Sequence, residues 1–495
     1  MGIEQKSAHT ESMRRSLELR SETEAQKLGK QAVRTVLSAL FDPGSFVELG
    51  EFYKEPQGDY GEGVVTGYGS VDGRLVFVWA QDATVVHGGM GKAQAQKTAR
   101  LLGLAVKAGA PVVSILDSRG ARISEGLDSL AAYGIIAEAL FAASGVVPQI
   151  AVVTGTCAGA ASTIAAAADF VVMAENAELF LQSPAVLEAK GLAGGTGGAL
   201  WASKRGLSHL TAADELGCMS LVRKLLSYLP SNNLDTAQKR SDDDINRPTP
   251  VLTDLIPEDD MTPFDIRAVI REFADDGEYI ELSEEYAREV TCGFISLAGK
   301  TVGVIANDSF EDEGLLTYRA CDKAASFAVR CDAFHIPLLT LCDTAGFEPA
   351  NKHRADALKG YALLQGAFAG ATVPKVSLVL RKAYGNGYLA MCSKHTGADI
   401  ALAYPGAVIS VLPPRTLVAL KGDESVAASE DPVAARDALA SEYAEEASPY
   451  EAARRGLIDD IIDPAATRQL LISSFEMLSG KRVAALPRKH ASLPL

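Results

Sequence analysis

The sequence predicts an α/β protein built from two tandem copies of one unit. Three observations support this prediction: the length of 495 residues, an internal repeat at a constant offset, and the alternation of apolar segments with helical segments. A chain of this length is too long for one ordinary hydrophobic core, so two domains are expected. Hydrophobic residues make up 47% of the chain, which is enough to form two sizeable cores.

The internal repeat aligns residues 110–121 with residues 336–347, at an offset of 226 positions. In this alignment Asp117 matches Asp343, and both precede a glycine-bearing turn. Self-similarity that persists over about a hundred residues indicates duplication of a whole domain. Further pairs share the offset: Gly73 with Gly299, Asp82 with Asp308, Gly88 with Gly314, Lys97 with Lys323, and Gly120 with Gly346.

Each copy contains the same predicted order of strands and helices. Continuous apolar strands that alternate with helices are typical of βαβ units with buried parallel strands. Helices are expected over Ala93–Ala108 and Arg319–Phe334. The strands are expected over Leu75–Trp79, Val112–Leu116 and Gln149–Thr154 in the first copy, and over Val302–Ile305, Leu338–Cys342 and Lys375–Leu380 in the second.

A polar, acidic and proline-containing stretch separates the two copies. It covers residues 230–263 and has the composition of a linker. The sequence therefore predicts one domain over 1–235, a linker over 236–262, and a second domain over 263–495.

Charge and cysteine content exclude several classes of protein. The net charge of −16 argues against nucleic-acid binding, which needs a basic surface. The seven cysteines form no CxxC motif and have no zinc-site spacing, so we expect no metal and reduced thiols in the cytoplasm. The charged N-terminus has no apolar segment of the kind found in signal peptides. An uncharged stretch lies between Glu138 and Asp169, but Pro148 and several small polar residues favour a buried strand and helix over a membrane span.

A turn of small residues follows the third predicted strand of each copy and precedes a helix. These turns cover residues 156–162 and 383–388. Small residues let a ligand approach the backbone, and N–H groups at a helix N-terminus can stabilise an anionic oxygen without any side chain. Tight packing of strand against helix is the alternative explanation. Recurrence at matching positions of the repeat favours a functional role.

Cys157 suggests a different chemistry. Residues 155–159 match the Gly-x-Ser-x-Gly nucleophile elbow, with Cys157 in the position of the serine. A cysteine hydrolase would also need a histidine and an acidic partner, and nothing in the sequence links any histidine to Cys157. The repeat places Ala383 opposite Cys157. We therefore do not favour a thiol hydrolase. Asp117 and Asp343 are either catalytic or caps of the turns that follow them.

Segments spread over nearly the whole chain carry a resemblance to a known family. They include FDPGSFVEL (41–49), ARISEGLDSLAAYG (121–134), CAGAAS (157–162), CDAFHIPLLTLCDTAGF (331–347), TVPKVSLVLRKAYGNGY (372–388) and SKHTGAD (393–399). The sequence resembles the carboxyltransferase subunits of biotin-dependent acyl-CoA carboxylases and the related decarboxylase subunits. The resemblance implies two crotonase-like domains.

The resemblance also implies where substrates bind. In this family the acyl-CoA thioester lies against the N-terminal unit of one protomer, and carboxybiotin lies against the C-terminal unit of another. Carried over to this chain, the thioester site falls on Gly159 and Ala160, and the biotin site falls on Asn386 and Gly387. Arg122 is a candidate for the CoA phosphates, and a solvated loop is an equally good interpretation. The expected substrate-binding residues are Gly120, Ala121, Arg122, Leu389, Gly346 and Phe347.

The implied partners follow from what the chain lacks. It has no Met-Lys-Met motif to carry biotin and no ATP-binding carboxylase domain, so the resemblance implies a biotin carboxylase or biotin carboxyl carrier subunit as partner. Because the two substrates meet different units, a homo-oligomer is implied, most simply a hexamer. The same site run in reverse would give a decarboxylase or transcarboxylase subunit.

Some residues depart from the family pattern. The family usually has Gly-Gly where this chain has Gly159-Ala160, and Gly-Ala where it has Asn386-Gly387. On the biotin side, the segments 347–350 and 412–415 also differ. These changes leave open a biotin-independent acyl-CoA-binding or decarboxylating relative. Leu389 stands where many propionyl-CoA-preferring relatives have Asp, which predicts an altered acyl preference.

Overall fold

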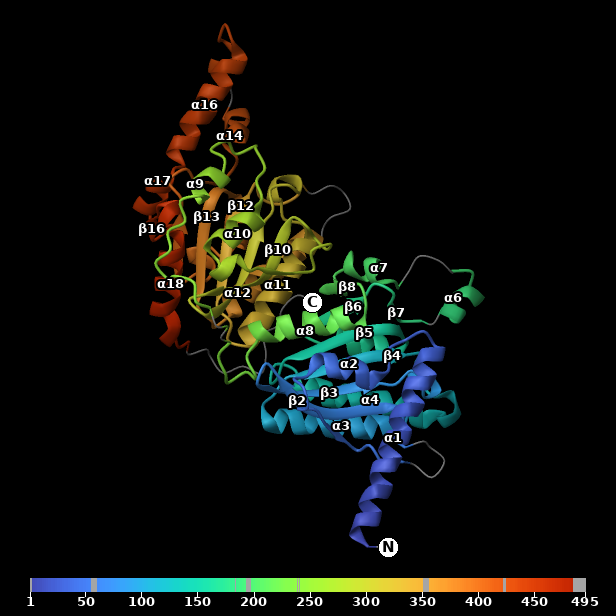
Figure 1. Ribbon diagram of the computed structural model, residues 1–495. Helices are drawn as coiled ribbons and strands as arrows, with labels where there is room; N and C mark the ends of the chain where they lie inside the picture. Colours follow the sequence, from blue (N-terminus) through green and yellow to red (C-terminus); the bar gives the residue numbers. More distant parts are fainter. Residues whose placement is uncertain are drawn as a thin grey trace. The chain divides into compact units, whose positions relative to one another are not determined.

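The chain divides into two compact units, Met1–Thr236 (unit 1) and Ala237–Leu495 (unit 2). The computed structural model describes residues 2–54, 60–182, 184–192, 197–237, 239, 241–349, 356–421 and 424–483. Each unit is built around one sheet with helices on its faces (Figure 1).

Unit 1 contains an eight-stranded sheet in the order β1-β2-β3-β4-β5-β6-β8, with β7 paired to β5. The strands β1, β2 and β3 pair antiparallel, and the pairs from β3 onward are parallel. The helices α3 and α4 cover one face, while α2 and α8 cover the other (Figure 1). The strands are β1 Val47–Leu49, β2 Val64–Val71, β3 Arg74–Gln81, β4 Val112–Ser118, β5 Gln149–Ala158, β6 Phe170–Ala174, β7 Glu178–Phe180 and β8 Leu210–Ala212; the helices are α1 Ile3–Lys27, α2 Val33–Leu40, α3 Lys92–Ala108, α4 Leu127–Ala143, α5 Ala160–Ala166, α6 Pro184–Ala189, α7 Ala199–Ser203 and α8 Glu215–Tyr228.

Unit 2 repeats this plan with the order β9-β10-β11-β12-β13-β14-β16, and β15 pairs with β13 as β7 does with β5. One apolar core joins its sheet to α10 and α18. The strands are β9 Ile280–Leu282, β10 Val290–Leu297, β11 Lys300–Asn307, β12 Leu338–Thr344, β13 Lys375–Tyr384, β14 Ile400–Ala403, β15 Val408–Ser410 and β16 Asp460–Ile461; the helices are α9 Leu252–Leu255, α10 Ile266–Phe273, α11 Tyr318–Ala333, α12 Asp356–Gly370, α13 Gly385–Ala390, α14 Pro414–Leu420, α15 Glu424–Ala427, α16 Pro432–Glu446, α17 Pro449–Arg454 and α18 Thr467–Met477.

The predicted α/β class with two duplicated domains is confirmed. Asp117 lies near the end of β4 and Asp343 near the end of β12, which occupy equivalent places in their sheets. The sequence did not predict the antiparallel β2–β3 and β10–β11 hairpins that extend each parallel sheet. Their strands are largely buried, as the parallel ones are, so hydrophobicity alone does not reveal their direction.

The repeat extends to individual buried side chains. The ammonium of Lys97 on α3 donates to the Val64 carbonyl at 2.6 Å, and the ammonium of Lys323 on α11 donates to the Val290 carbonyl at 2.7 Å. Both pairs are related by the offset of 226. Burial lowers the pKa of both lysines, to about 8 for Lys97.

The segment that composition predicts as a linker, 236–262, makes contacts with unit 2. The Lys239 N–H donates to the Gly299 carbonyl at 2.9 Å, and the Thr249 N–H donates to the Ala465 carbonyl at 2.8 Å. Thr249 is fully buried. Much of this polar stretch is therefore part of the second unit's structure.

The uncharged stretch after Glu138 forms the end of α4, the strand β5 and the short helix α5. The strand β5 is buried along almost its whole length. No helix in the described part of the chain is both long and apolar enough to cross a membrane.

The buried Lys97 gives a testable pH dependence. Because its folded-state pKa is lowered from 10.5 to about 8, the unfolded chain binds more protons between these values. The contribution of Lys97 to the free energy of unfolding should therefore increase as the pH rises through this window. Urea unfolding of wild type and Lys97→Met at several pH values measures it. The stability difference between the two should shift in favour of wild type with rising pH, whereas the exposed-lysine control Lys92→Met should show no such trend.

Candidate active site

Each unit has a glycine turn at the carboxyl end of its central strand. In unit 1 Gly159 follows β5 with φ 65°, and α5 begins at Ala160. In unit 2 Gly385 follows β13 with φ 53°. These positive φ values favour glycine, which has no Cβ to clash with the backbone. Gly385 is absent from the residues that the sequence predicts for the site, although the offset of the repeat relates it to Gly159.

A second glycine turn lies against the first in each unit. An ideal Cβ on Gly120 would be 3.5 Å from the Ala158 carbonyl oxygen. In unit 2 an ideal Cβ on Gly387 would be 2.9 Å from the Cα of Gly346. The structure therefore brings together residues that are about 40 positions apart and that the sequence assigns to one site.

The Gly120 turn is held by hydrogen bonds on both sides of Ala121. The Gly120 N–H donates to the Ser118 hydroxyl at 3.1 Å. The Gly120 carbonyl accepts from the Met90 N–H at 2.9 Å, and the Arg122 N–H donates to the Met90 carbonyl at 2.8 Å. The N–H of Ala121, between these bonded groups, has no acceptor among the described residues.

The Gly346 turn repeats this arrangement. The Gly346 N–H donates to the Thr344 hydroxyl at 3.1 Å, and the Gly346 carbonyl accepts from the Leu316 N–H at 2.9 Å. The Glu348 N–H donates to the Leu316 carbonyl at 3.1 Å. Phe347 corresponds to Ala121, and within the described ranges its N–H likewise has no acceptor.

The first turns supply further unpaired donors. The Gly159 N–H donates to the Phe180 carbonyl at 2.9 Å, so it is occupied in this conformation. Ala160 is the first residue of α5, and the N–H groups of a first helical turn have no partner inside the helix. The same holds for Asn386 and Gly387 in α13. No described residue accepts from these three N–H groups.

Arg122 points inward instead of toward solvent. Its guanidinium donates to the Gly89 carbonyl at 3.0 Å, to the Glu62 carbonyl at 2.9 Å and to the Glu62 carboxylate at 3.1 Å. It also lies 3.3 Å from the Glu125 carboxylate. In this conformation the side chain is occupied in holding the loop, and it is not available to a phosphate.

The two aspartates at the strand ends are both paired with a cation. Asp117 forms an ion pair with Lys30, which lies between α1 and α2. Asp343 forms an ion pair with Arg381 of β13, at 2.9 Å. An amide side chain supports each aspartate, because Gln81 accepts from the Asp117 N–H and Asn307 accepts from the Asp343 N–H. These contacts favour a structural role for both carboxylates over a catalytic one.

Cys157 is fully buried, and burial, together with the charge of Asp117, raises the pKa of its thiol. A raised pKa leaves the thiol protonated, whereas the nucleophile is the thiolate. A cysteine nucleophile would also need a histidine partner. In His209, Nδ1 already accepts from the Val171 N–H at 2.9 Å. These observations count against a cysteine nucleophile.

Leu389 lies on α13, three residues after Asn386, and is half-buried. Residues three apart lie on the same side of a helix, so Leu389 and Asn386 share a face of α13. This places the leucine beside the turn of unit 2.

Two α/β units, each with unpaired backbone N–H groups on two contacting glycine turns, define a tandem crotonase-like enzyme. The carboxyl transferase domain matches residues 24–493. The chain is 40% identical to the methylmalonyl-CoA decarboxylase subunit alpha of Propionigenium modestum, over 94% of each chain. It is 41% identical to a putative propionyl-CoA carboxylase beta chain of Bacillus subtilis, again over 94% of each. The chain belongs to the carboxyl transferase family.

A solved structure agrees with this assignment. The transcarboxylase 12S crystal structure, described as a hexamer assembly with methylmalonyl-coenzyme A and methylmalonic acid bound, has a TM-score of 0.93. It is 37% identical in sequence, and the match covers 100% of this chain and 99% of that one. The resemblance inferred from the sequence motifs is therefore confirmed.

Catalysis by backbone donors predicts opposite effects for two neighbouring substitutions. Cys157→Ala should retain most of the carboxyltransferase activity, because the thiol takes no part. Gly159→Val should lower kcat by at least about 10²–10³, the typical loss for one oxyanion donor, because a β-branched residue is strained at φ 65° and would displace the turn that presents the Ala160 N–H.

The measurement is the rate of carboxyl transfer for both variants, with thermal unfolding to verify that each is folded. A folded, inactive Cys157→Ala beside an active Gly159→Val would contradict backbone catalysis.

Proposed function

We propose that this enzyme transfers a carboxyl group between carboxybiotin, carried on a partner protein, and the α-carbon of a short acyl-CoA. The observation that carries the proposal is the recurrence, in both units, of unpaired N–H groups on two contacting turns. The reaction develops negative charge on two oxygens, that of the thioester enolate and that of the biotin ureido group. Backbone donors fixed in place stabilise such charge without reorganisation.

The donors of unit 1 are assigned to the thioester oxygen. Ala160 contributes one N–H from the start of α5, and Ala121 contributes a second from the neighbouring turn. Gly159 shapes the turn through its positive φ, while its own N–H remains bonded to Phe180. Gly120 keeps the second turn close to the first.

The donors of unit 2 are assigned to the ureido oxygen of biotin. Asn386, Gly387 and Phe347 present unpaired backbone N–H groups, and this donor set fits an oxygen that gains negative charge. Biotin supplies the carboxyl group and, once decarboxylated, the base that removes the α-proton. The protein residues hold the two oxygens and supply no side-chain base in this proposal, since Asp343 is paired with Arg381.

The relatives support both the substrate class and the assembly. They are named as a methylmalonyl-CoA decarboxylase subunit and a propionyl-CoA carboxylase chain, so the acyl group is short and the direction depends on the partner. We propose a homo-oligomer, with the hexamer described for transcarboxylase 12S as the expected form. The biotin-bearing partner is a biotin carboxylase or carboxyl carrier subunit. The seven cysteines are buried and unpaired, in keeping with a cytoplasmic location.

A biotin-independent relative is the second candidate, suggested by the altered residues of unit 2. Glu348 differs from the family pattern, yet its N–H still fastens the turn to Leu316. Ala350 lies outside the described residues. Because the proposed donors are backbone groups, these side-chain changes do not remove them, and we favour the biotin-dependent reaction.

The test uses proline to delete one N–H at a time. Proline is tolerated in the first turn of a helix, so Ala160→Pro and Asn386→Pro remove a donor with little damage to α5 or α13. Decarboxylation of methylmalonyl-CoA or malonyl-CoA is followed with free biotin. Each proline variant should lose about 10²–10³ in kcat, whereas Ala160→Ser and Asn386→Ala, which keep the N–H, should lose far less. Decarboxylation by wild type that is indifferent to biotin would refute the proposal in favour of the biotin-independent relative.

The leucine beside the unit 2 turn should influence the choice of acyl group. Leu389 occupies the position that lines the acyl pocket in the family that the sequence resembles, so Leu389→Asp would introduce a charge and change the shape of that pocket. A methylene in such a pocket shifts preference by about 1–3 kcal/mol. We expect the ratio of kcat/KM among acetyl-, propionyl- and butyryl-CoA to change. Thermal unfolding of the variant provides the folding control. An unchanged ratio in a folded variant would remove Leu389 from the site.

A further inference from the structure

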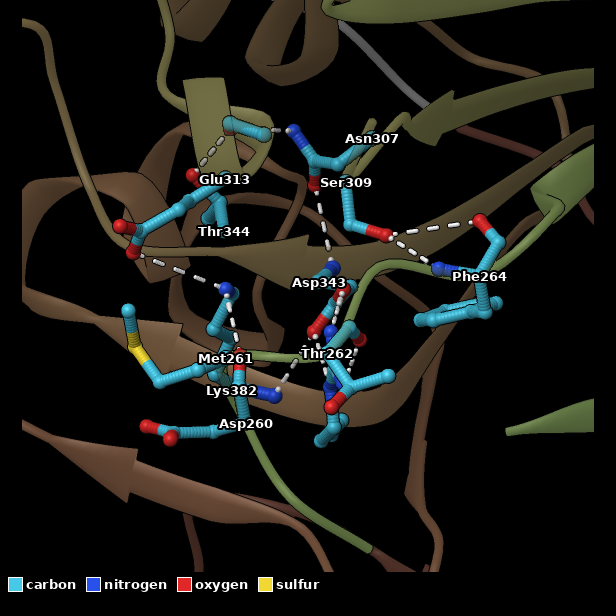
Figure 2. Close-up of polar contacts among 12 residues, drawn as sticks. Asp260, Met261, Thr262, Phe264, Asn307, Ser309, Glu313, Asp343, Thr344 and Lys382 are labelled. Atoms are coloured by element: carbon cyan, nitrogen blue, oxygen red, sulfur yellow. Dashed lines mark hydrogen bonds and ion pairs between the residues drawn. The ribbon is translucent and has the colours of Figure 1, made fainter. Parts of the chain in front are cut away.

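A segment before α10, Asp259–Phe264, crosses the end of β13 and is bound there by two buried cations. We call this segment the strap. The Arg381 guanidinium donates to the Asp259 carbonyl at 2.5 Å and to the Thr262 carbonyl at 2.7 Å. The Lys382 ammonium donates to the Asp260 carbonyl at 2.9 Å. Figure 2 shows the strap residues beside Lys382 and Asp343.

The strap satisfies charges that would otherwise be buried without enough partners. Arg381 and Lys382 are 3% and 2% exposed, and the buried carboxylate of Asp343 accepts from the Arg381 guanidinium at 2.9 Å. The Glu313 carboxylate lies 3.8 Å from the Lys382 ammonium, which is beyond hydrogen-bond distance. Among the described residues, the Asp260 carbonyl is the acceptor for that ammonium. Loss of the strap would leave a buried cation unpaired, which is costly.

The strap also contacts the residue that begins the proposed biotin-side turn. The Tyr384 hydroxyl donates to the Asp260 carboxylate at 3.1 Å. Tyr384 is buried and directly precedes Gly385, Asn386 and Gly387. Lys382 and Tyr384 therefore tie the same strap residue, Asp260, to the last three residues of β13.

Unit 1 holds its equivalent turn in a different way. At the offset of 226, Lys382 corresponds to Thr156 and Tyr384 to Ala158, so unit 1 has neither the ammonium nor the phenol hydroxyl at these positions. There the Gly159 N–H is fixed by the Phe180 carbonyl of β7. The N–H of Gly385 makes no such bond to any described residue, so the turn of unit 2 lacks that anchor.

We propose that the strap is part of the biotin-side site, and that Lys382 and Tyr384 are positioning residues that fix the Gly385–Gly387 turn through Asp260. This rests on the assignment of that turn to biotin under the proposed function. The segment that composition predicts as linker thus sets the geometry of one half-site. The acyl-CoA turn of unit 1, which has its own anchor, does not depend on it.

The test removes each contact with a substitution that preserves bulk. Lys382→Met deletes the ammonium, and Tyr384→Phe deletes the hydroxyl. Each should lower kcat/KM for free biotin by about tenfold, the effect of roughly one hydrogen bond to a charged group. The dissociation constant for the CoA ester should stay within about twofold, because it reports on unit 1. Asp260→Asn keeps the backbone carbonyl that accepts from Lys382 and one side-chain oxygen that can accept from the Tyr384 hydroxyl, so its kcat/KM for free biotin should stay near that of wild type.

Two matched controls lie in the same unit. Lys375 begins β13, is also buried, and donates to the Phe368 and Ala371 carbonyls at 2.6 and 2.7 Å. Tyr404 is a buried tyrosine whose hydroxyl bonds to Thr467 at 2.8 Å. Lys375→Met and Tyr404→Phe should reduce stability without a selective loss of biotin-dependent kcat/KM. An equal loss in these controls would overturn a positioning role for Lys382 and Tyr384.

Hydrogen exchange of the full-length enzyme tests the positioning role of the strap independently of whether the turn binds biotin. Peptides covering residues 383–388 should take up deuterium faster in Lys382→Met than in wild type or Lys375→Met, whether or not biotin is a substrate. Unchanged exchange would overturn the positioning role even if wild type uses biotin. If Lys382→Met exchanges faster but the wild-type enzyme does not use biotin, the strap still positions the turn, and only the assignment of the turn to biotin is refuted.

Discussion

The chemistry proposed for this enzyme depends on backbone N–H groups that have no acceptor among the described residues. Backbone donors stabilise developing negative charge without reorganisation only where the surrounding chain holds them in place. The glycines at the ends of β5 and β13 provide that condition, because their positive φ turns the chain sharply out of the sheet and into a short helix. The second glycine turn, at Gly120 or Gly346, then approaches closely enough to place another donor nearby.

Parallel sheets explain why the donors gather where they do. The central strands β5 and β13 are buried along almost their whole length, so their polar groups become accessible chiefly where these strands end. The neighbouring strands β4 and β5 both end at the same edge, as do β12 and β13. The two turns of each unit therefore meet as a consequence of strand direction.

The two units share the same arrangement at the strand end, but a different cation pairs with the aspartate in each. In both, an amide side chain supports an aspartate, and a hydroxyl from Ser118 or Thr344 caps the following glycine. The cation differs: Lys30 reaches Asp117 from the N-terminal segment, whereas Arg381 reaches Asp343 from the adjacent strand. Gly155 stands at the position of Arg381 in unit 1, where any side chain would collide with Asp117. After duplication, both units thus kept the backbone donors, while the cations that pair with the supporting aspartates diverged.

The sequence by itself determined the duplication, the α/β class, the family and the residues of both turns, because these follow from local patterns and from a constant offset. Gly159, Ala160, Asn386 and Phe347 were assigned to the site by the resemblance to the family. Only the tertiary structure decided which N–H groups are free, because pairing depends on distant partners: Phe180 occupies the N–H of Gly159 and leaves that of Ala160. Tertiary contacts likewise turned Arg122 inward and joined a polar segment, predicted as linker, to Arg381 and Lys382. Hydrogen bonds between positions more than a hundred residues apart leave no signal in composition or periodicity.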